Sequence, residues 1–305
     1  MSRMLHLAAA MDPIAAVDDG CHVELARLAE RGGLDFVTLD DDSSALAVLT
    51  RVAHATSRVG LVPGVTTTGT EPWRVRAAVA ALDRVSHGRA GWRIDVPAAA
   101  GAAGGAGEAA DAAAGLWDDR EDDAGARGEP RSPQGRPVRV VDATEEPARR
   151  VAARYADVAL VRVAGRAQAA AVRDRLREEA AAYGRGRHGP RVLASLLVDL
   201  GGGEHAAEPG HGGGGPRQTA RGPLYRGGPV DLAELIAAWY TEGAVDGFHL
   251  TPVEPRRDLE RLVNGTAALL QHRGLFRTFY PGGTLRDHLG LAAPAARHTV
   301  AGGAS

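Results

Sequence analysis

Residues 35–63, DFVTLDDDSSALAVLTRVAHATSRVGLVP, contain one complete strand–helix–strand unit. The runs at 35–39 and 59–63 are short and rich in Val and Leu, which is typical of strands in a parallel sheet that is covered on both faces. Residues 44–56 place apolar side chains three and four positions apart, as an amphipathic helix does, and Ser43 is a suitable N-cap. This stretch therefore predicts a βα unit on a parallel sheet.

The same alternation recurs along most of the 305 residues. Strands are predicted at 5–10, 35–39, 59–63, 91–96, 138–142, 157–163, 192–198 and 247–250. Helices are predicted at 23–31, 44–56, 72–85, 144–154, 167–183, 232–242 and 257–272. Eight βα units in a chain of this length favour a closed (β/α)8 TIM barrel over an open sheet. We expect a single α/β domain over 1–305, with flexible loop insertions at 97–128 and 201–228 and a C-terminal tail at 274–305.

Charge and composition exclude several functions. All 36 basic residues are arginine, against 38 acidic residues, which leaves a formal net charge of -2. Without lysine the chain cannot be a Schiff-base aldolase, a pyridoxal-phosphate enzyme or a P-loop NTPase. The balanced charge argues against nucleic acid or an anionic membrane as a partner. A small-molecule partner is the better expectation.

The sole cysteine, Cys21, rules out an internal disulfide and a cysteine metal cluster within this chain. We expect no metal site. The apolar run near the first residues is interrupted by Asp12 and Pro13. It is too short for a membrane-spanning helix and weak as a signal peptide, so we expect a cytoplasmic protein.

Three blocks of sequence carry a resemblance to a known family. The first comprises LARLAERGGLDFVTLDDD (25–42) and RVAHATSRVGLVPGVTTTGTEPWRVRAAVAALDRVSHGRAGW (51–92). The second is LWDDREDDAGARGEPRSPQGRPVRVVDAT (116–144), and the third is DGFHLTPVEPRRDLERLVNGTAALLQHRGLFRTFYPGGTLRDHLGL (246–291). In this order they resemble the nitrilotriacetate monooxygenase-like branch of the bacterial luciferase-like, flavin-dependent monooxygenase superfamily.

The resemblance implies a luciferase-like barrel with shortened insertions and a two-component monooxygenase activity. Reduced FMN would come from a separate NAD(P)H:flavin reductase, and a small organic substrate would be oxidised with dioxygen. The resemblance also implies a homodimer. By resemblance, seven residues are cofactor-binding candidates: Asp41, Thr66, Thr67, Trp92, Arg93, Asp142 and Thr144. Trp92 and Arg93 lie on a predicted strand and the other five end or follow one, near the strand ends where TIM-barrel sites are built.

His249, on the predicted last strand, is the candidate catalytic proton donor, because an imidazole titrates near neutral pH. Several of these candidates also have a purely structural interpretation. Asp41 could equally cap the following helix, Thr66 could sit at a strand end for structural reasons, and Trp92 could be core packing. His249 could be an ordinary hydrogen-bonded histidine.

The sequence departs from the family's pattern at two strand ends. WRIDVP places Arg93 where the family has Asn, and Val96 and Pro97 where it has hydroxyl side chains. DATEE places Glu145 in the turn expected to meet the flavin phosphate, where like charges repel. Two alternatives therefore stay open: a deazaflavin-dependent oxidoreductase, and a catalytically silent barrel that acts as an interaction or regulatory partner.

Overall fold

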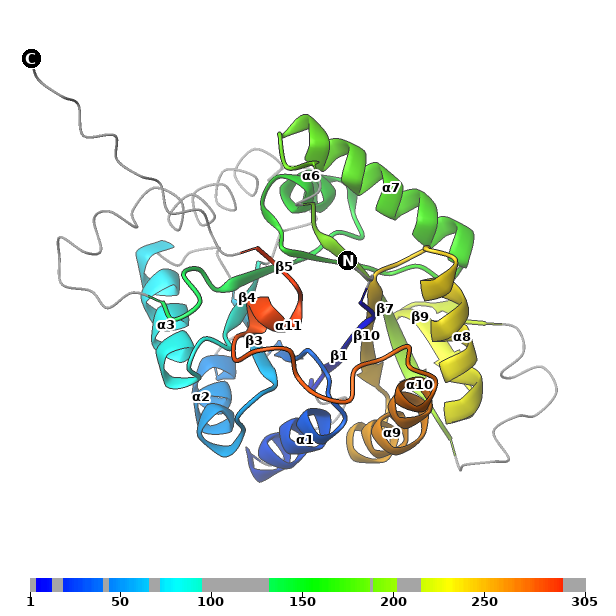
Figure 1. The fold of residues 1–305 in the computed structure, drawn as a ribbon, viewed down its shortest axis with the longest axis horizontal. Coiled ribbons are helices and arrows are strands. Elements are labelled where there is room, and N and C mark those ends of the chain that lie inside the picture. The colour runs from blue at the N-terminus through cyan, green and yellow to red at the C-terminus, as the bar shows by residue number, and fades with distance from the viewer. Residues whose placement is uncertain are drawn as a thin grey trace, which may run out of the picture.

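A computed structural model describes residues 4–12, 19–40, 44–65, 72–94, 132–186, 189–201 and 215–292. Eight parallel strands pair in the order β10-β1-β2-β3-β4-β5-β6-β7, and a further pairing of β10 with β7 closes the sheet into a barrel. The helices form an outer ring around these strands (Figure 1). The structure therefore confirms the predicted TIM barrel.

The barrel strands are β1 (His6–Ala10), β2 (Phe36–Leu39), β3 (Gly60–Val65), β4 (Gly91–Ile94), β5 (Val138–Asp142), β6 (Val158–Val161), β7 (Arg191–Asp199) and β10 (Gly247–Pro252). The helices are α1 (Asp19–Arg31), α2 (Ala45–Ala55), α3 (Pro72–Val85), α6 (Glu146–Tyr155), α7 (Arg166–Ala182), α8 (Pro229–Thr241), α9 (Pro255–Arg261), α10 (Ala268–His272) and α11 (Leu285–His288), and the π-helical segment η3 (Leu262–Ala267) joins α9 to α10. Each predicted strand corresponds to one of these strands, and each predicted helix to one of these helices, with differences of a few residues at the ends. The exception is the predicted helix at 257–272, which is divided into α9, η3 and α10. No helix in the described ranges is long and apolar enough to cross a lipid bilayer.

Side chains alternate between two apolar layers because successive residues of a strand face opposite ways. The larger layer lies between the strands and the helices. A smaller cluster fills the barrel interior and includes Phe36, Val62, Val140 and Leu193. Strands β1 and β10 approach so closely that a Cβ at Gly247 would lie 2.0 Å from the His6 carbonyl oxygen. Only glycine fits at that contact.

The C-terminal tail closes the barrel at the N-terminal ends of the strands. Leu285 and Leu289 of α11 belong to the interior cluster, and α11 lies over the centre of the ring of helices (Figure 1). Arg277 forms a buried ion pair with Asp35, and Arg286 lies 3.5 Å from Asp157. The tail is therefore an integral part of the barrel up to the last described residue.

Buried aspartates tie neighbouring strands together at this same end. Asp35 accepts a 2.8 Å hydrogen bond from the Leu7 N–H, and Asp157 accepts one of 2.9 Å from the Arg139 N–H. Asp246 accepts one of 2.9 Å from the Val192 N–H. Each aspartate precedes a strand and satisfies a backbone donor that the ladder leaves open.

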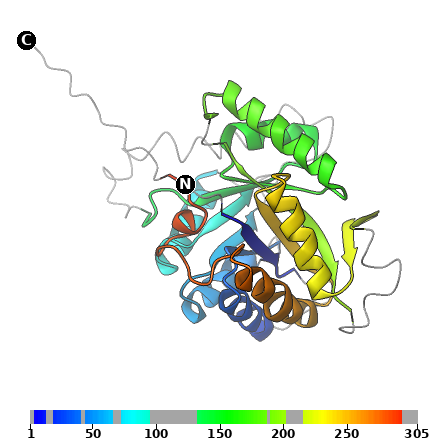
Figure 2. The same ribbon diagram turned by 45° about the vertical axis from the view of Figure 1, so that its right-hand side comes forward.

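The expectation of a loop over 201–228 is wrong for its second half. Residues 217–226 form a hairpin of β8 (Arg217–Thr219) and β9 (Gly222–Arg226), and β9 pairs in parallel with the end of β7. The hairpin stands out beside α8 (Figure 2). Its pairing partner is β7, so local glycine content was a poor guide. Residues 202–214 and the other predicted insertion at 97–128 lie outside the described residues.

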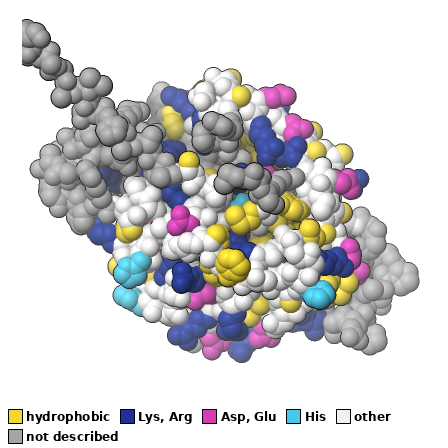
Figure 3. Space-filling view, viewed as in Figure 1, with side chains coloured by type: hydrophobic (Ala, Val, Ile, Leu, Met, Phe, Trp, Pro, Cys, Tyr) yellow, Lys and Arg dark blue, Asp and Glu magenta, His cyan; other side chains and the backbone are white. Residues whose placement is uncertain are grey.

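The face of the molecule that carries the tail shows basic and acidic side chains interspersed (Figure 3). Neither sign of charge dominates this face, as expected from the formal net charge of -2. Interspersed charges produce no extended field of one sign.

Candidate active site

A cavity of about 460 Å³ opens at the C-terminal ends of the barrel strands. It is lined by Ala10, Asp12, Asp40, Arg93, Asp142, Leu160, Arg162, Ser195, Leu196, Leu197, Arg221, Gly222, Pro223, His249 and Thr251. Seven different strands or strand ends contribute, together with the β8–β9 hairpin. Its size falls within the roughly 300–1,000 Å³ usual for small-molecule sites, and its position is the one that TIM-barrel enzymes use.

His249 of β10 lies at the floor of the cavity with both ring nitrogens engaged. Nε2 is 2.9 Å from Thr38 Oγ1, and Nδ1 is 3.1 Å from Ser195 Oγ. The ring is buried and stacks on Phe36 with centroids 6.4 Å apart. Burial, and next the positive charge of Arg93, lower the His249 pKa to about 3. The imidazole is therefore neutral at physiological pH and is held rigidly between two hydroxyl groups.

We expect the His249 ring to remain uncharged from pH 8 down to pH 5. Ring-carbon NMR should show no titration over this range, and His249→Gln identifies the resonance. Because the unfolded chain takes up this proton below its ordinary pKa of 6.5 and the folded chain does not, the free energy of unfolding should fall between pH 6.5 and 3. A midpoint near 6.5 in the folded protein would contradict this expectation.

Arg93 and Asp40 form an ion pair across the cavity wall. Arg93 is the third residue of β4, and Asp40 follows β2. Between them lies Gly64 of β3, where an added Cβ would be 2.7 Å from Asp40 Oδ1. The glycine thus makes room for the Asp40 carboxylate. Arg93 stands where the resemblance has Asn, and its charge has an internal partner within the cavity.

Asp142 and Arg162 form a second ion pair, 2.6 Å between Oδ2 and Nη2. Asp142 Oδ1 also accepts hydrogen bonds from the Thr144 hydroxyl at 2.6 Å and from the Thr144 N–H at 3.1 Å. Thr144 Oγ1 in turn accepts from the Arg162 N–H at 3.1 Å. Thr144 therefore orients the Asp142 carboxylate and is not itself part of the cavity lining.

Asp12 follows β1 and completes the acidic part of the lining. Its Oδ1 accepts a hydrogen bond from the Asp40 N–H. Burial, and next the negative charge of Asp40, raise the Asp12 pKa to about 6. Burial likewise raises the pKa of Asp40 although Arg93 opposes the shift. The cavity thus contains a carboxyl group that titrates near neutral pH.

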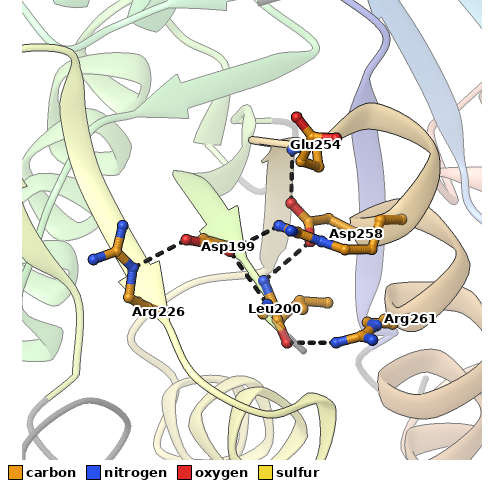
Figure 4. A network of polar contacts seen from close by, with 8 residues as sticks. Asp199, Leu200, Arg226, Glu254, Asp258 and Arg261 are labelled. Atoms are coloured by element: carbon orange, nitrogen blue, oxygen red, sulfur yellow. Dashed lines mark hydrogen bonds and ion pairs between the residues drawn. The ribbon is translucent and has the colours of Figure 1, made fainter. Parts of the chain in front are cut away.

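The β8–β9 hairpin brings Arg221 to the rim. A network of polar contacts fixes the hairpin to the barrel (Figure 4). Arg226 of β9 contacts Asp199 of β7 at 3.0 Å, and Arg257 of α9 contacts Asp199 at 2.8 Å and Asp258 at 2.8 Å. Among the described residues, no carboxylate pairs with the exposed Arg221 guanidinium. Of the arginines that the structure describes in the lining, Arg221 is therefore the one open to a ligand's anionic group.

The structure brings three of the predicted site residues to the cavity: Arg93, Asp142 and His249. The structure does not support Trp92 as a cofactor-binding candidate. Its side chain is fully buried in the layer between strands and helices and does not line the cavity. Its neighbour Arg93 faces inward, and alternation turns Trp92 the other way. Asp41, Thr66 and Thr67, with Val96 and Pro97, lie outside the described residues.

Glu145 is exposed at the N-cap of α6 and is absent from the cavity lining. Sequence reasoning missed Asp12, Asp40, Arg162, Ser195 and Arg221. For Asp40 a signal was present, because a charged residue directly after a predicted strand marks the mouth of a barrel. Arg162 lay inside the predicted strand 157–163, whereas β6 ends at Val161. Arg221 offered no such signal, since its hairpin depends on pairing with β7.

Comparison with known proteins identifies the family. Residues 15–211 match the family described as luciferase-like monooxygenase. The chain belongs to the luciferase-like monooxygenase family. This confirms the resemblance drawn from the three sequence blocks, and the match spans more than half of the 305 residues.

Two curated relatives extend over almost the whole chain. Component A of nitrilotriacetate monooxygenase from Aminobacter aminovorans is 27% identical, with 92% of each chain covered. The N-acetyl-S-(2-succino)cysteine monooxygenase of Bacillus subtilis is 24% identical, with 96% of this chain and 95% of the relative covered. The first alignment spans 416 positions, more than the 305 residues of this chain, so that relative contains segments that this luciferase-like protein lacks.

Solved structures agree on the fold. EDTA monooxygenase from Chelativorans sp. BNC1 superposes with a TM-score of 0.81 at 17% identity, covering 95% of this chain and 99% of that one. At this identity the likeness concerns the fold alone. It supports the luciferase-like barrel independently of the sequence blocks.

Proposed function

We propose that this protein is an FMN-dependent, two-component monooxygenase that oxidises a small organic substrate with dioxygen. A separate NAD(P)H:flavin reductase would supply the reduced flavin, and the proposal includes a homodimer. The observation that carries it is the cavity at the barrel mouth of a luciferase-like chain, with three arginines in its lining. The two long relatives are monooxygenases by name.

The residues present fit a flavin with a phosphate tail. Arg221 and Arg162 at the rim would hold the phosphate, because guanidinium groups bind phosphate oxygens in a forked geometry. The neutral His249, Ser195 and Thr251 offer polar atoms toward the interior. Glu145, the expected obstacle, is exposed and outside the lining. When bound, reduced FMN supplies the two electrons that activate dioxygen.

The chain's own contribution is to orient the ligand. Arg93 is held by Asp40, and Arg162 is held by Asp142. Charges fixed in this way need little rearrangement when a ligand binds, which favours electrostatic stabilisation. The uncharged His249 can donate or accept a hydrogen bond at a fixed position through the hydroxyl groups beside it.

Arg221→Gln should weaken binding of reduced FMN about 10- to 100-fold, because a hydrogen bond to a charged group contributes about 1.5–3 kcal/mol. It should leave riboflavin, which lacks the phosphate, unaffected. Anaerobic titration followed by flavin absorbance measures both. Arg217→Gln, on the same hairpin but outside the cavity lining, is the matched control, and Glu145→Ser should also change nothing.

Absence of FMN binding to the wild-type protein would reject the proposal in favour of a catalytically silent barrel. Selective binding of a deazaflavin without oxygen consumption would point instead to hydride transfer. Equal losses for FMN and riboflavin in Arg221→Gln would show that the hairpin arginine does not hold the phosphate.

A further inference from the structure

Asp12 and Asp40 are neighbours in the cavity lining, where each follows the end of a strand. Strands β1 and β2 are parallel neighbours with Ala10 opposite Thr38, so the residues two positions further on are also level. The Asp40 N–H donates to Asp12 Oδ1. Both carboxyl groups line the cavity that also contains His249. A ligand in this cavity is therefore within reach of two adjacent carboxyl groups.

Two carboxylates this close cannot both be charged without cost. Two like charges about 4 Å apart repel by about 4 kcal/mol at a protein-surface dielectric, so such a pair retains one proton to a higher pH than an isolated carboxyl group does. The ion pair with Arg93 favours the charged form of Asp40. Consequently the proton resides on Asp12 below its pKa of about 6, and a fraction of the molecules still carry it at pH 7. The other charged or titratable groups in the lining are Asp142, Arg162, Arg221 and His249.

Among the described residues of the lining, no other group releases a proton at neutral pH. His249 is uncharged and has both nitrogens engaged. The arginines keep their protons at any working pH. Asp142 forms an ion pair with Arg162 and accepts two hydrogen bonds from Thr144. The chain has no lysine.

We propose that Asp12, sharing one proton with Asp40, is the proton donor of this cavity and protonates an oxygen atom derived from dioxygen. This rests on the proposed function. Reduced, anionic FMN would supply two electrons and one hydrogen, and Asp12 would supply the second proton. With an organic substrate, one oxygen atom enters the product and the other leaves as water; without it, hydrogen peroxide forms. The Asp12 O–H bond breaks, and the carboxylate regains its proton from solvent through the open mouth.

The first test titrates the carboxyl groups of the full-length protein without ligand, by carboxyl-carbon NMR on aspartate-labelled protein. Asp12→Asn assigns the resonance and keeps an oxygen that can accept from the Asp40 N–H. We expect a midpoint near 6 for Asp12. Asp40→Asn should lower it by removing the negative neighbour, and Asp174→Asn, exposed on α7, should not move it. A midpoint near the ordinary value of 3.8 would overturn the shared proton.

The second test follows reoxidation of bound, reduced FMN by dioxygen in a stopped-flow instrument. Asp12→Asn should slow reoxidation about 100-fold at pH 7, the lower end of general acid catalysis. It should also abolish the fall in rate that we expect in the wild-type protein as the pH rises through about 6 and Asp12 loses its proton. Asp12→Glu should restore both in part. Unchanged rates in an Asp12→Asn protein that binds FMN would overturn the donor role alone. Failure of the wild-type protein to bind FMN would overturn the proposed function and the donor role together.

Discussion

Asp35→Ala is expected to lower the free energy of unfolding by about 3–5 kcal/mol, the usual cost of removing one partner of a buried ion pair. Asp35 is fully buried and pairs with Arg277. It also lies 3.1 Å from His6 Nδ1 and accepts from the Leu7 N–H. Alanine would leave the buried Arg277 guanidinium without its counter-charge. Equilibrium unfolding in urea measures the change.

The control for this experiment is Asp174→Ala, which removes an exposed carboxylate that contacts Arg173. It should change stability by less than about 0.5 kcal/mol. Burial by itself raises the pKa of Asp35, but Arg277 and His6 outweigh it and hold that pKa below 3.8. The stabilisation is therefore complete above pH 3.8 and is lost as the pH falls through the lower folded value. Equal acid sensitivity in Asp35→Ala and wild type would contradict this assignment.

Leu285→Ala should cost about 2–5 kcal/mol, because a buried leucine replaced by alanine loses transfer energy and leaves a cavity. Leu285 is fully buried in the barrel interior although it belongs to the C-terminal tail. Its Cδ1 lies 2.6 Å from where a Cβ would stand at Gly60. The glycine therefore makes space for this leucine, and the loss should appear in thermal and urea unfolding.

Leu285→Met is the matched control, since a hydrophobic swap of similar volume costs less than about 1.5 kcal/mol. If Leu285→Ala were as stable as wild type, the tail would not be filling the barrel. If both variants were severely destabilised, shape at this position would matter more than burial.

Prediction from sequence succeeded where the signal is local. The runs at 138–142 and 192–198 are rich in Val and Leu, as strands covered on both faces are, and the structure has strands there. The hairpin at 217–226 was missed because β9 is stabilised by pairing with β7 rather than by its own composition. Residues 274–305 were predicted only as a C-terminal tail, because no local sequence pattern indicates that Leu285 packs inside the barrel.

For the site, the sequence could nominate residues at strand ends but could not pair them. Arg93 and Asp142 line the cavity, yet their partners Asp40 and Arg162 come from other strands. Trp92 and Arg93 are adjacent in sequence and face opposite sides of β4. An error of one residue in assigning side chains to the two faces of the strand would therefore place the wrong one of them in the cavity.

The amino-acid sequence was sufficient to determine the repeated βα unit, through the periodicity and type of its residues. From that unit follow the parallel barrel and the end of the barrel at which a ligand would bind. Tertiary structure alone decided that His249 is uncharged, that Asp12 and Asp40 share a neighbourhood, and that Arg221 reaches the rim. The physical reason is that helical and strand periodicity arise from neighbouring residues. Charge, protonation and access instead depend on groups that only closure of the barrel brings within a few ångströms of one another.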